Sequence, residues 1–263
     1  MPVSSRARPF VILAAALAIV GGAFGYWRES RRADAQGAGE GHLAAQLAGA
    51  GIDGKQRAAF EQIVRAYILD HPEILPEAMD RLQARETQAK IAPLRGALET
   101  PFPGAVLGNP QGRVTLVEFT DFSCTYCRGS VADVRALIAA NPDLKVVVRE
   151  LPIIAPESEP AARMALAAAA QGRYAAYHDA MFAGERPSET SIAAAAGKAG
   201  VDMAAARSFA ANDGVQKELE RNLGFARQLG VTGTPAWIIG GEMIAGAVGR
   251  ERLQQAVDAA RKG

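Results

Sequence analysis

The stretch FTDFSCTYCRGS, residues 119–130, holds both cysteines of this 263-residue chain, Cys124 and Cys127. It continues an apolar, β-branched run, VTLVEF at residues 114–119, that predicts a strand. After the cysteines, apolar side chains recur at helical spacing through residues 131–138. We therefore expect a strand to give way to a helix here, with Cys124 at the helix N-terminus and Cys127 in its first turn.

Two cysteines in this arrangement favour redox chemistry. Unpaired N–H groups and the helix dipole stabilise a thiolate at Cys124, which makes it the attacking sulfur, and Cys127 is placed to resolve the mixed disulfide. A zinc site needs further ligands, and His42, His71 and His178 are not spaced to supply them. A structural disulfide is disfavoured because so short a loop gains little from closure. We expect no metal ion and no cofactor.

The composition excludes one class of function. The chain carries 29 basic and 28 acidic side chains, a net charge of +1, so it has no positive field that would attract nucleic acid. Its apolar fraction of 49% is sufficient for an ordinary globular core. The length suits one large or two small domains.

The N-terminus predicts export. Arg6 and Arg8 precede an uncharged apolar run at residues 10–27, so residues 1–30 are interpreted as a signal peptide or a signal anchor. If retained, the run anchors the protein in the inner membrane; small residues at 33–35 offer a cleavage site as the alternative. Residues 31–52 are interpreted as a linker. In either case we expect the rest of the chain in the periplasm or cell envelope, where disulfides form.

Residues 53–98 predict a helical segment. Apolar residues recur at helical spacing from Phe60 onward, Asp53 is available as an N-cap, and His71-Pro72 ends the first helix before a second begins. The bulky residues are few, so this segment is expected to bury its apolar faces in a homo-oligomer. The alternative is that it packs on its own domain.

Residues 100–263 predict a second domain of the α/β class. Strands are expected near residues 105–107, 114–119, 145–151, 236–239 and 243–245, with a last helix at 250–262. The strand, helix and strand around the cysteines predict a right-handed parallel unit. An Ala-rich helical insert is expected at about residues 157–230.

A second motif, VTGTPAW at residues 231–237, places Thr234 and Pro235 directly before a strand. With the upstream Cys-x-x-Cys, this order resembles the thioredoxin superfamily, in which a cis-proline loop faces the dithiol. The resemblance implies a thioredoxin-like fold. It also implies that the backbone before Pro235 pairs with an extended substrate peptide.

Glu118 precedes Cys124 by six residues. On the pattern alone it is better interpreted as a half-exposed strand residue, but the superfamily places a buried acid at the matching position. The resemblance therefore implies that Glu118 relays the proton of Cys127 through water. Phe122 and Tyr126 are expected to contact the substrate, although either fits a core position equally well.

The helical insert resembles the DsbA family of exported thiol-disulfide oxidoreductases, over roughly residues 100–263. The segment YILDHPEIL, residues 67–75, resembles the N-terminal domain of the ScsC and Com1-like branch, which can mediate trimerisation in ScsC-type proteins. DsbA proteins commonly carry Pro-His between the cysteines, whereas this chain has Thr125 and Tyr126. We therefore expect a lower reduction potential than that of a strong oxidant, which favours shuffling or reducing disulfides over introducing them.

The resemblance implies a disulfide isomerase, oxidase or reductase. Its substrates are extracytoplasmic proteins with cysteines, and a membrane redox partner resets the dithiol. Two alternatives remain at this point. The thiols could bind Cu(I), which soft ligands favour, in a copper-handling or holdase protein. The dithiol could instead be vestigial in an interaction module.

Overall fold

The computed structural model describes residues 49, 51 and 53–262. The predicted signal or anchor at residues 1–30, its apolar run at 10–27 and nearly all of the linker at 31–52 lie outside the described residues. The chain divides into two compact units, of which one ends at Glu77 and the other begins at Ala78. Among the described residues, no helix combines the length and the apolar character that crossing a membrane requires.

Two predicted helices are present before the sheet. α2 (Gly54–Asp70) starts at the N-cap Asp53, whose side chain accepts hydrogen bonds from the backbone of Lys55 and Gln56, and ends at the C-cap His71. α3 (Ile74–Ile91) follows after a short turn and continues into the second unit. No residue of α2 is buried. Its large apolar side chains are exposed and comprise Phe60, Ile63, Val64, Tyr67 and Leu69.

The second unit is built on a five-stranded sheet of order β1-β3-β2-β4-β5. Its strands are β1 (Val106–Gly108), β2 (Val114–Thr120), β3 (Leu144–Glu150), β4 (Ala236–Ile239) and β5 (Glu242–Ala245). β2 and β3 pair in parallel and are joined by α5 (Thr125–Ala140), which confirms the predicted strand–helix–strand unit. The other three pairings are antiparallel.

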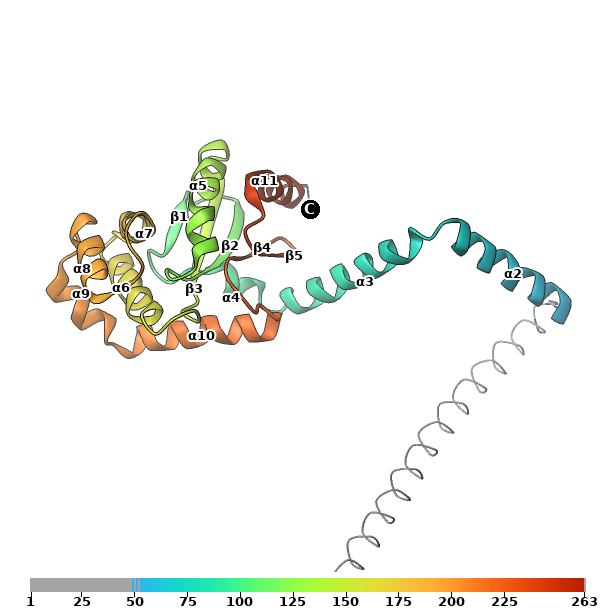
Figure 1. The fold of residues 1–263 in the computed structure, drawn as a ribbon, viewed down its shortest axis with the longest axis horizontal. Helices are drawn as coiled ribbons and strands as arrows, with labels where there is room; N and C mark the ends of the chain where they lie inside the picture. Colours follow the sequence, from blue (N-terminus) through green and yellow to red (C-terminus); the bar gives the residue numbers. More distant parts are fainter. Residues whose placement is uncertain (1–48, 50, 52, 263) are drawn as a thin grey trace, which may run out of the picture. The chain divides into compact units, whose positions relative to one another are not determined.

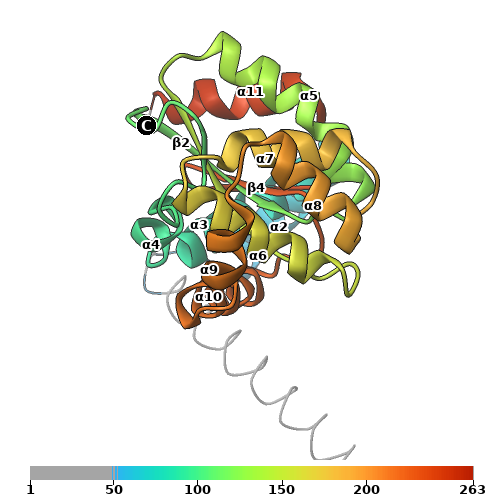
Figure 2. The same cartoon turned by 90° about the vertical axis from the view of Figure 1, so that its left-hand side faces the viewer.

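Each face of this sheet has its own apolar core. α5 and α11 (Gly249–Ala260) cover one face, and α4 (Arg95–Glu99) and α10 (Asp213–Leu229) cover the other, as Figures 1 and 2 show. Side chains alternate along β2, so Leu116 belongs to the first core while Val117 and Phe119 belong to the second. The five-residue helix α4 was not predicted from the sequence.

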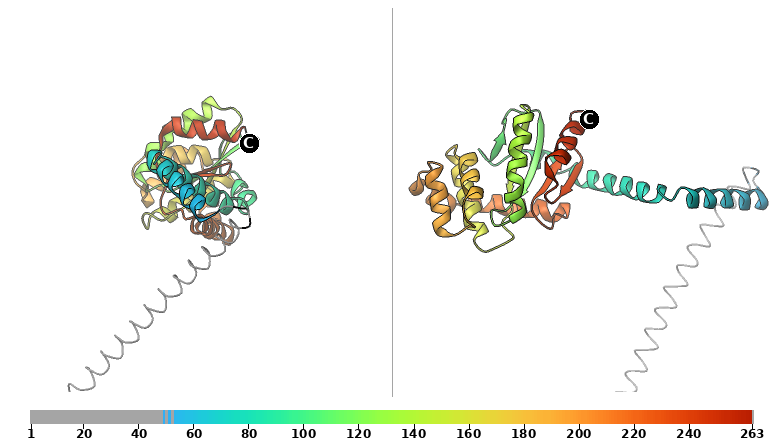
Figure 3. Two further views of the ribbon diagram at one scale, coloured as in Figure 1. Left: turned by 90° about the vertical axis from the view of Figure 1, so that its right-hand side faces the viewer. Right: turned by 45° about the horizontal axis from the view of Figure 1, so that its top comes forward.

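The predicted helical insert consists of five helices. They are α6 (Ser158–Ala170), α7 (Tyr174–Ala183), α8 (Glu189–Lys198), α9 (Met203–Ala210) and α10. Alanines dominate the buried face of α6, which lets neighbouring helices approach closely. In the right panel of Figure 3, α6 to α9 gather beside the sheet, and α5 lies between them and α11. The α/β, thioredoxin-like architecture predicted from the sequence is therefore confirmed.

Candidate active site

The two cysteines lie where β2 ends and α5 begins, as predicted. Cys124 is the N-cap of α5, and its Sγ accepts a hydrogen bond from the backbone N–H of Cys127 at 3.4 Å. Both thiols are free; Cys124 is 5% exposed and Cys127 only 1%. The sulfur nearer the surface is therefore the one at the helix N-terminus, where the dipole favours a negative charge.

The loop before β4 faces this dithiol. The Thr234–Pro235 peptide bond is cis, and the Cys124 thiol donates a hydrogen bond to the Thr234 carbonyl at 3.1 Å. The Pro235 carbonyl accepts from the Gly246 N–H at 2.8 Å, which fixes the start of β4. The fold thus brings together Cys124, Thr234 and Pro235, although 110 positions separate Cys124 from Thr234.

Cys127 has a polar but buried environment. Burial is the largest influence and raises the pKa of its thiol well above the ordinary value. The nearby hydroxyls of Thr234 and Thr120 and the backbone of Asp121 lower the pKa, but by less than burial raises it. This thiol therefore stays protonated at neutral pH unless a nearby base accepts the proton.

Glu118 lies on β2, on the same face of the sheet as the dithiol. Its side chain is buried, and within the described chain its Oε2 atom has no hydrogen-bond partner. Burial raises the pKa of this carboxyl to about 8, so it is largely protonated at neutral pH. The buried acid that the family resemblance implied is thus present at this position.

The two aromatic residues next to the cysteines, Phe122 and Tyr126, differ in their exposure to solvent. Phe122 is only 1% exposed, and its ring lies 4.9 Å from that of Phe182 and 5.8 Å from that of Tyr177 on α7. Phe122 therefore occupies the core position that the sequence analysis gave as the alternative to substrate contact, because the insert helix α7 covers this side chain. Tyr126 is 70% exposed beside Cys124 and remains available to a substrate.

Asp121 was missed by the sequence analysis. Its Oδ1 accepts from the Ser123 N–H at 2.8 Å, while Oδ2 accepts from the N–H groups of Ile153 at 2.8 Å and Ile154 at 2.9 Å. One carboxylate therefore holds the loop after β3 against the turn that carries the cysteines. The exposed side chains of Tyr126, Ile153 and Ile154 form an apolar rim around the dithiol.

Glu150, the last residue of β3, was also missed. It is completely buried, and its Oε1 accepts a hydrogen bond from the Tyr174 hydroxyl at 2.7 Å. Burial raises its pKa well above the ordinary value for a glutamate, and that hydrogen bond opposes the rise. The signal for Glu150 was weaker than that for Glu118, because Glu150 ends a strand that also carries Lys145 and Arg149, whereas Glu118 is the one charged residue of β2.

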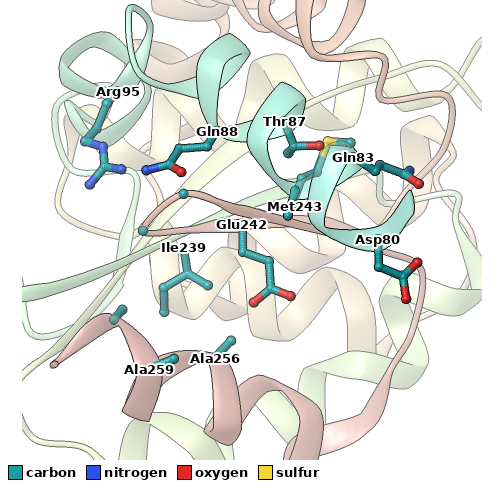
Figure 4. A pocket seen from close by; sticks show the side chains of 14 residues that line it. Asp80, Gln83, Thr87, Gln88, Arg95, Ile239, Glu242, Met243, Ala256 and Ala259 are labelled. Carbon is teal, nitrogen blue, oxygen red and sulfur yellow. The ribbon is translucent and has the colours of Figure 1, made fainter. Parts of the chain in front are cut away.

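A separate pocket of about 660 Å³ lies within the second unit, between the later turns of α3, the β4–β5 hairpin and α11. Figure 4 shows Met243 of the hairpin extending toward α3, whereas the carboxylate of Glu242 points away from α3 toward α11. No cysteine lines this pocket. In the described part of the chain, no group of three or more Asp, Glu, His or Cys side chains is arranged to hold a metal ion.

Two family models match the chain. Residues 115–258 match the DSBA-like thioredoxin domain, and residues 56–89 match the N-terminal domain of the copper resistance protein ScsC. The first match contains the dithiol and the cis-proline loop. The second covers most of α2 and α3.

A curated relative of different length also matches. The chain is 30% identical over 190 residues to a Na(+)/H(+) antiporter NhaA of Herminiimonas arsenicoxydans, which covers 70% of this chain and 30% of the antiporter. The chain spans 28–30% of the length of the curated relatives it matches. Because the match covers less than a third of each antiporter, it does not indicate an antiporter function for this chain.

Solved structures share the fold. A thioredoxin-like oxidoreductase from Silicibacter pomeroyi is 39% identical, with a TM-score of 0.58, covering 60% of this chain and 92% of its own. The thiol-disulfide exchange protein alpha-DsbA2 from Wolbachia pipientis is 27% identical, with a TM-score of 0.62, covering 68% and 97%. With its strand order, dithiol and cis-proline loop, the chain belongs to the family of DsbA-like thioredoxin domains and has the fold of thiol-disulfide oxidoreductases.

Proposed function

We propose that this protein catalyses thiol-disulfide exchange on protein substrates through Cys124 and Cys127. The Cys124 thiolate attacks a substrate disulfide and releases one substrate thiol. Cys127 then attacks Cys124, closes the disulfide within the protein and releases the second substrate thiol, so two electrons pass to the substrate. The observation that carries this proposal is the 3.1 Å contact between the Cys124 thiol and the Thr234 carbonyl, which aligns the attacking sulfur with the cis-proline loop.

Glu118 is proposed to accept the proton of Cys127 before resolution. The thiol of Cys127 is buried and its pKa is raised by burial, so it needs a base within the protein. A carboxyl with a pKa of about 8 is partly ionised near neutral pH and can both take up and return a proton there. A bridging water would carry the proton between the two groups.

Substrates are proposed to be extracytoplasmic proteins with cysteines, bound as extended segments. The backbone around Thr234 precedes β4 and is placed for main-chain pairing with such a segment. The apolar rim of Tyr126, Ile153 and Ile154 offers contacts for apolar side chains that flank the substrate disulfide. Unfolded or misfolded proteins expose such side chains.

The residues around the dithiol favour shuffling or reduction of disulfides. Thr125 and Tyr126 stand between the cysteines, and neither has the cationic side chain that would hold Cys124 as a thiolate. A less stabilised thiolate makes the disulfide form more stable, which lowers the reduction potential. A membrane redox partner is proposed to reset the dithiol after each turnover, in the periplasm or cell envelope to which residues 1–30 direct the chain.

Residues 53–98 are proposed to form a homo-oligomer. The large apolar side chains of α2 are exposed, and residues 56–89 match the ScsC N-terminal domain. We expect Ile63→Asp with Tyr67→Asp to yield monomers in sedimentation, because charges cannot be buried in an apolar helix interface. Lys55→Asp, at the start of the same helix, is the matched charge control. A monomeric parent protein would contradict this proposal.

The function is tested by two assays on the same preparation. Reduction of insulin disulfides measures electron transfer, and recovery of an enzyme with scrambled disulfides measures shuffling. We expect activity in at least one assay, and loss of both with Cys124→Ser. Full activity of the Cys124→Ser protein would contradict the mechanism.

A copper-binding protein is the second candidate, because the family matched by residues 56–89 is named for copper resistance. The two thiolates are soft ligands suited to Cu(I), and a second chain could complete the coordination. Titration of the reduced protein with Cu(I) under anaerobic conditions tests this candidate. Tight binding without any disulfide exchange would favour it, while exchange without tight binding would exclude it.

A further inference from the structure

The buried oxygens that lack partners gather behind the dithiol. Among the described residues, four side chains on this side of the sheet have a buried oxygen without a hydrogen-bond partner: Glu118, Thr120, Glu150 and Thr234. Buried polar groups are ordinarily hydrogen-bonded, and each exception needs an explanation. Four exceptions around one thiol indicate a site where protons move.

The strand register places two of these groups next to each other. Thr120 on β2 pairs with Glu150 on β3, and Glu118 pairs with Val148 one step earlier. Residues two apart share a face of the sheet, so Glu118 and Thr120 lie on the same side. Val148 belongs to the core that contains Cys127, which places Glu150, two residues later, on that side as well.

Thr120 also lies beside the reacting sulfur. Its hydroxyl and that of Thr234 are close enough to the Cys127 thiol to lower its pKa, although neither is hydrogen-bonded to it in the structure. The Thr120 backbone is fixed as well, because its carbonyl accepts from the Leu151 N–H at 2.8 Å. A hydroxyl can accept one proton and donate another, so Thr120 can link the thiol to a base on β3.

We propose that Glu150 is a second proton acceptor for Cys127, reached through the hydroxyl of Thr120. This inference rests on the proposed disulfide exchange and adds a route to the one through Glu118. Thr120 is then the link nearest the reacting sulfur, and Glu150 is a positioning residue that acts through it.

The proton and electron balance of the step is complete. The Cys127 thiol passes its proton to Thr120 while Thr120 passes its own to the Glu150 carboxylate, which leaves a Cys127 thiolate. The thiolate attacks the Cys124 sulfur of the mixed disulfide, and the bond between Cys124 and the substrate sulfur breaks. The substrate leaves as a thiolate carrying the electron pair, and the proton held by Glu150 returns to it by the reverse path or through solvent.

Tyr174 lowers the pKa of Glu150 by donating a hydrogen bond to it. Its phenol donates to Oε1 of Glu150, which stabilises the carboxylate and leaves Oε2 available to Thr120. The titratable groups that act on Glu150 are Tyr174 of α7, Asp121 in the turn after β2 and Glu118 of β2. Tyr177 of α7 is also nearby, and the charge of Glu150 raises the pKa of its phenol. Charges on Glu118 and Asp121 disfavour an ionised Glu150. The two buried glutamates therefore compete for one negative charge, and either can take the proton.

The test separates attack from resolution in the full chain. The reduced protein is mixed with oxidised glutathione, quenched with acid at short times, and analysed by mass for the mixed disulfide at Cys124. We expect Glu150→Gln to slow resolution at least tenfold near pH 7 and to remove one ionisation from its pH profile. This is less than the roughly 10²–10⁴-fold typical of an acid–base group, because the route through Glu118 remains. The rate of attack by Cys124 should not change.

A second pair of variants tests the same inference if the Glu150→Gln protein does not fold. Tyr174→Phe removes the donor to Glu150 and should shift the pH profile of resolution to higher pH. Tyr177→Phe is the matched control, because the Tyr177 hydroxyl donates to the Ala161 carbonyl and not to Glu150. It should leave the profile in place.

The outcomes are distinguishable. Resolution within twofold of the parent in Glu150→Gln, or an unshifted profile in Tyr174→Phe, would overturn the role of Glu150 while the proposed function stands. A parent protein that never forms the mixed disulfide would overturn the proposed function, and the inference with it.

Discussion

Arg149 and Glu150 are neighbours on β3, yet their side chains lie on opposite faces of the sheet and have opposite surroundings. Arg149 is fully buried and pairs with Glu218 of α10 at 2.7 Å, and it also donates to the carbonyls of Ala97 and Leu98. Glu150 has only the hydroxyl of Tyr174 on one oxygen and no partner on the other within the described chain. Each nitrogen of the Arg149 guanidinium has a hydrogen-bond partner, whereas one oxygen of the Glu150 carboxyl has none within the described chain.

The two faces of the sheet therefore differ in the state of their buried charged groups. On the Arg149 face, the ion pair joins β3 to α10 and to the turn around α4, so its groups have fixed charges and fixed partners. On the dithiol face, the acids have raised pKa values because burial disfavours their charged forms. Both of these acids also have one oxygen without a hydrogen-bond partner in the described chain.

Cys124→Ser is expected to have the largest effect on activity. A serine hydroxyl at this position stays protonated and cannot attack a disulfide, so turnover should fall to the uncatalysed rate. The free energy of unfolding should change little, because the substitution is nearly isosteric. Insulin reduction and urea unfolding measure the two quantities. Residual turnover near the parent rate would assign the chemistry to another group.

Arg149→Met is expected to have the largest effect on stability. Removing Arg149 leaves the buried Glu218 carboxylate with only the exposed Arg221 as its charged partner, which costs about 3–5 kcal/mol of unfolding free energy. The rate of exchange per folded molecule should be retained, because Arg149 lies on the far face of the sheet. Urea unfolding with a matched activity assay checks both.

The double variant Arg149→Met with Glu218→Met sharpens this test. It removes both charges and should be more stable than Arg149→Met alone. A double variant as unstable as the sum of two single ones would show that the pair does not act as a unit.

Glu118→Gln should alter how stability depends on pH. The carboxyl has a pKa of about 8 in the folded protein and about 4.5 when exposed, so the folded state holds one more proton between these values. The stabilisation that this proton gives to the folded state is fully present below pH 4.5. As the pH rises from 4.5 to 8, the free energy of unfolding falls by about 1.4 kcal/mol per pH unit. Glu118→Gln should remove that slope.

Urea unfolding at pH 6.5, 7.25 and 8 measures this slope. His178, whose pKa is lowered by burial, adds a slope of opposite sign as the pH falls towards 6.5, but it adds the same slope to the parent and to the variant. The dependence of the unfolding free energy on pH that comes from Glu150 remains in the Glu118→Gln protein. An equal slope in the parent and in Glu118→Gln would show that Glu118 is ionised throughout.

Tyr126→Ala should have the smallest effect. The side chain is 70% exposed, so the free energy of unfolding should change by less than about 0.5 kcal/mol. The KM for a peptide disulfide with apolar flanking residues should rise a few-fold, while the KM for glutathione disulfide should not. An equal change for both substrates would remove Tyr126 from the substrate contact.

Local patterns in the sequence predicted the elements and the dithiol. Apolar, β-branched runs located the strands, and helical spacing of apolar residues located the helices. The position of Cys124 as an N-cap followed from the point where the strand pattern gives way to the helical pattern. The burial of Phe122 could not be predicted, because it depends on α7, whose position against β2 is not encoded in any local pattern. Asp121, Thr120 and Glu150 were missed for the same reason: their roles come from strand register and from contacts with the insert.

The equilibrium of the reduced chain with glutathione tests the central claim most directly. Alkylation and mass analysis at defined ratios of reduced to oxidised glutathione give the fraction with the Cys124–Cys127 disulfide. We predict that both thiols are oxidised together in one two-electron transition, with a potential between those of about −120 mV for a strong oxidant and about −270 mV for thioredoxin. Thiols that stay reduced at every ratio, or that react one at a time, would contradict the account.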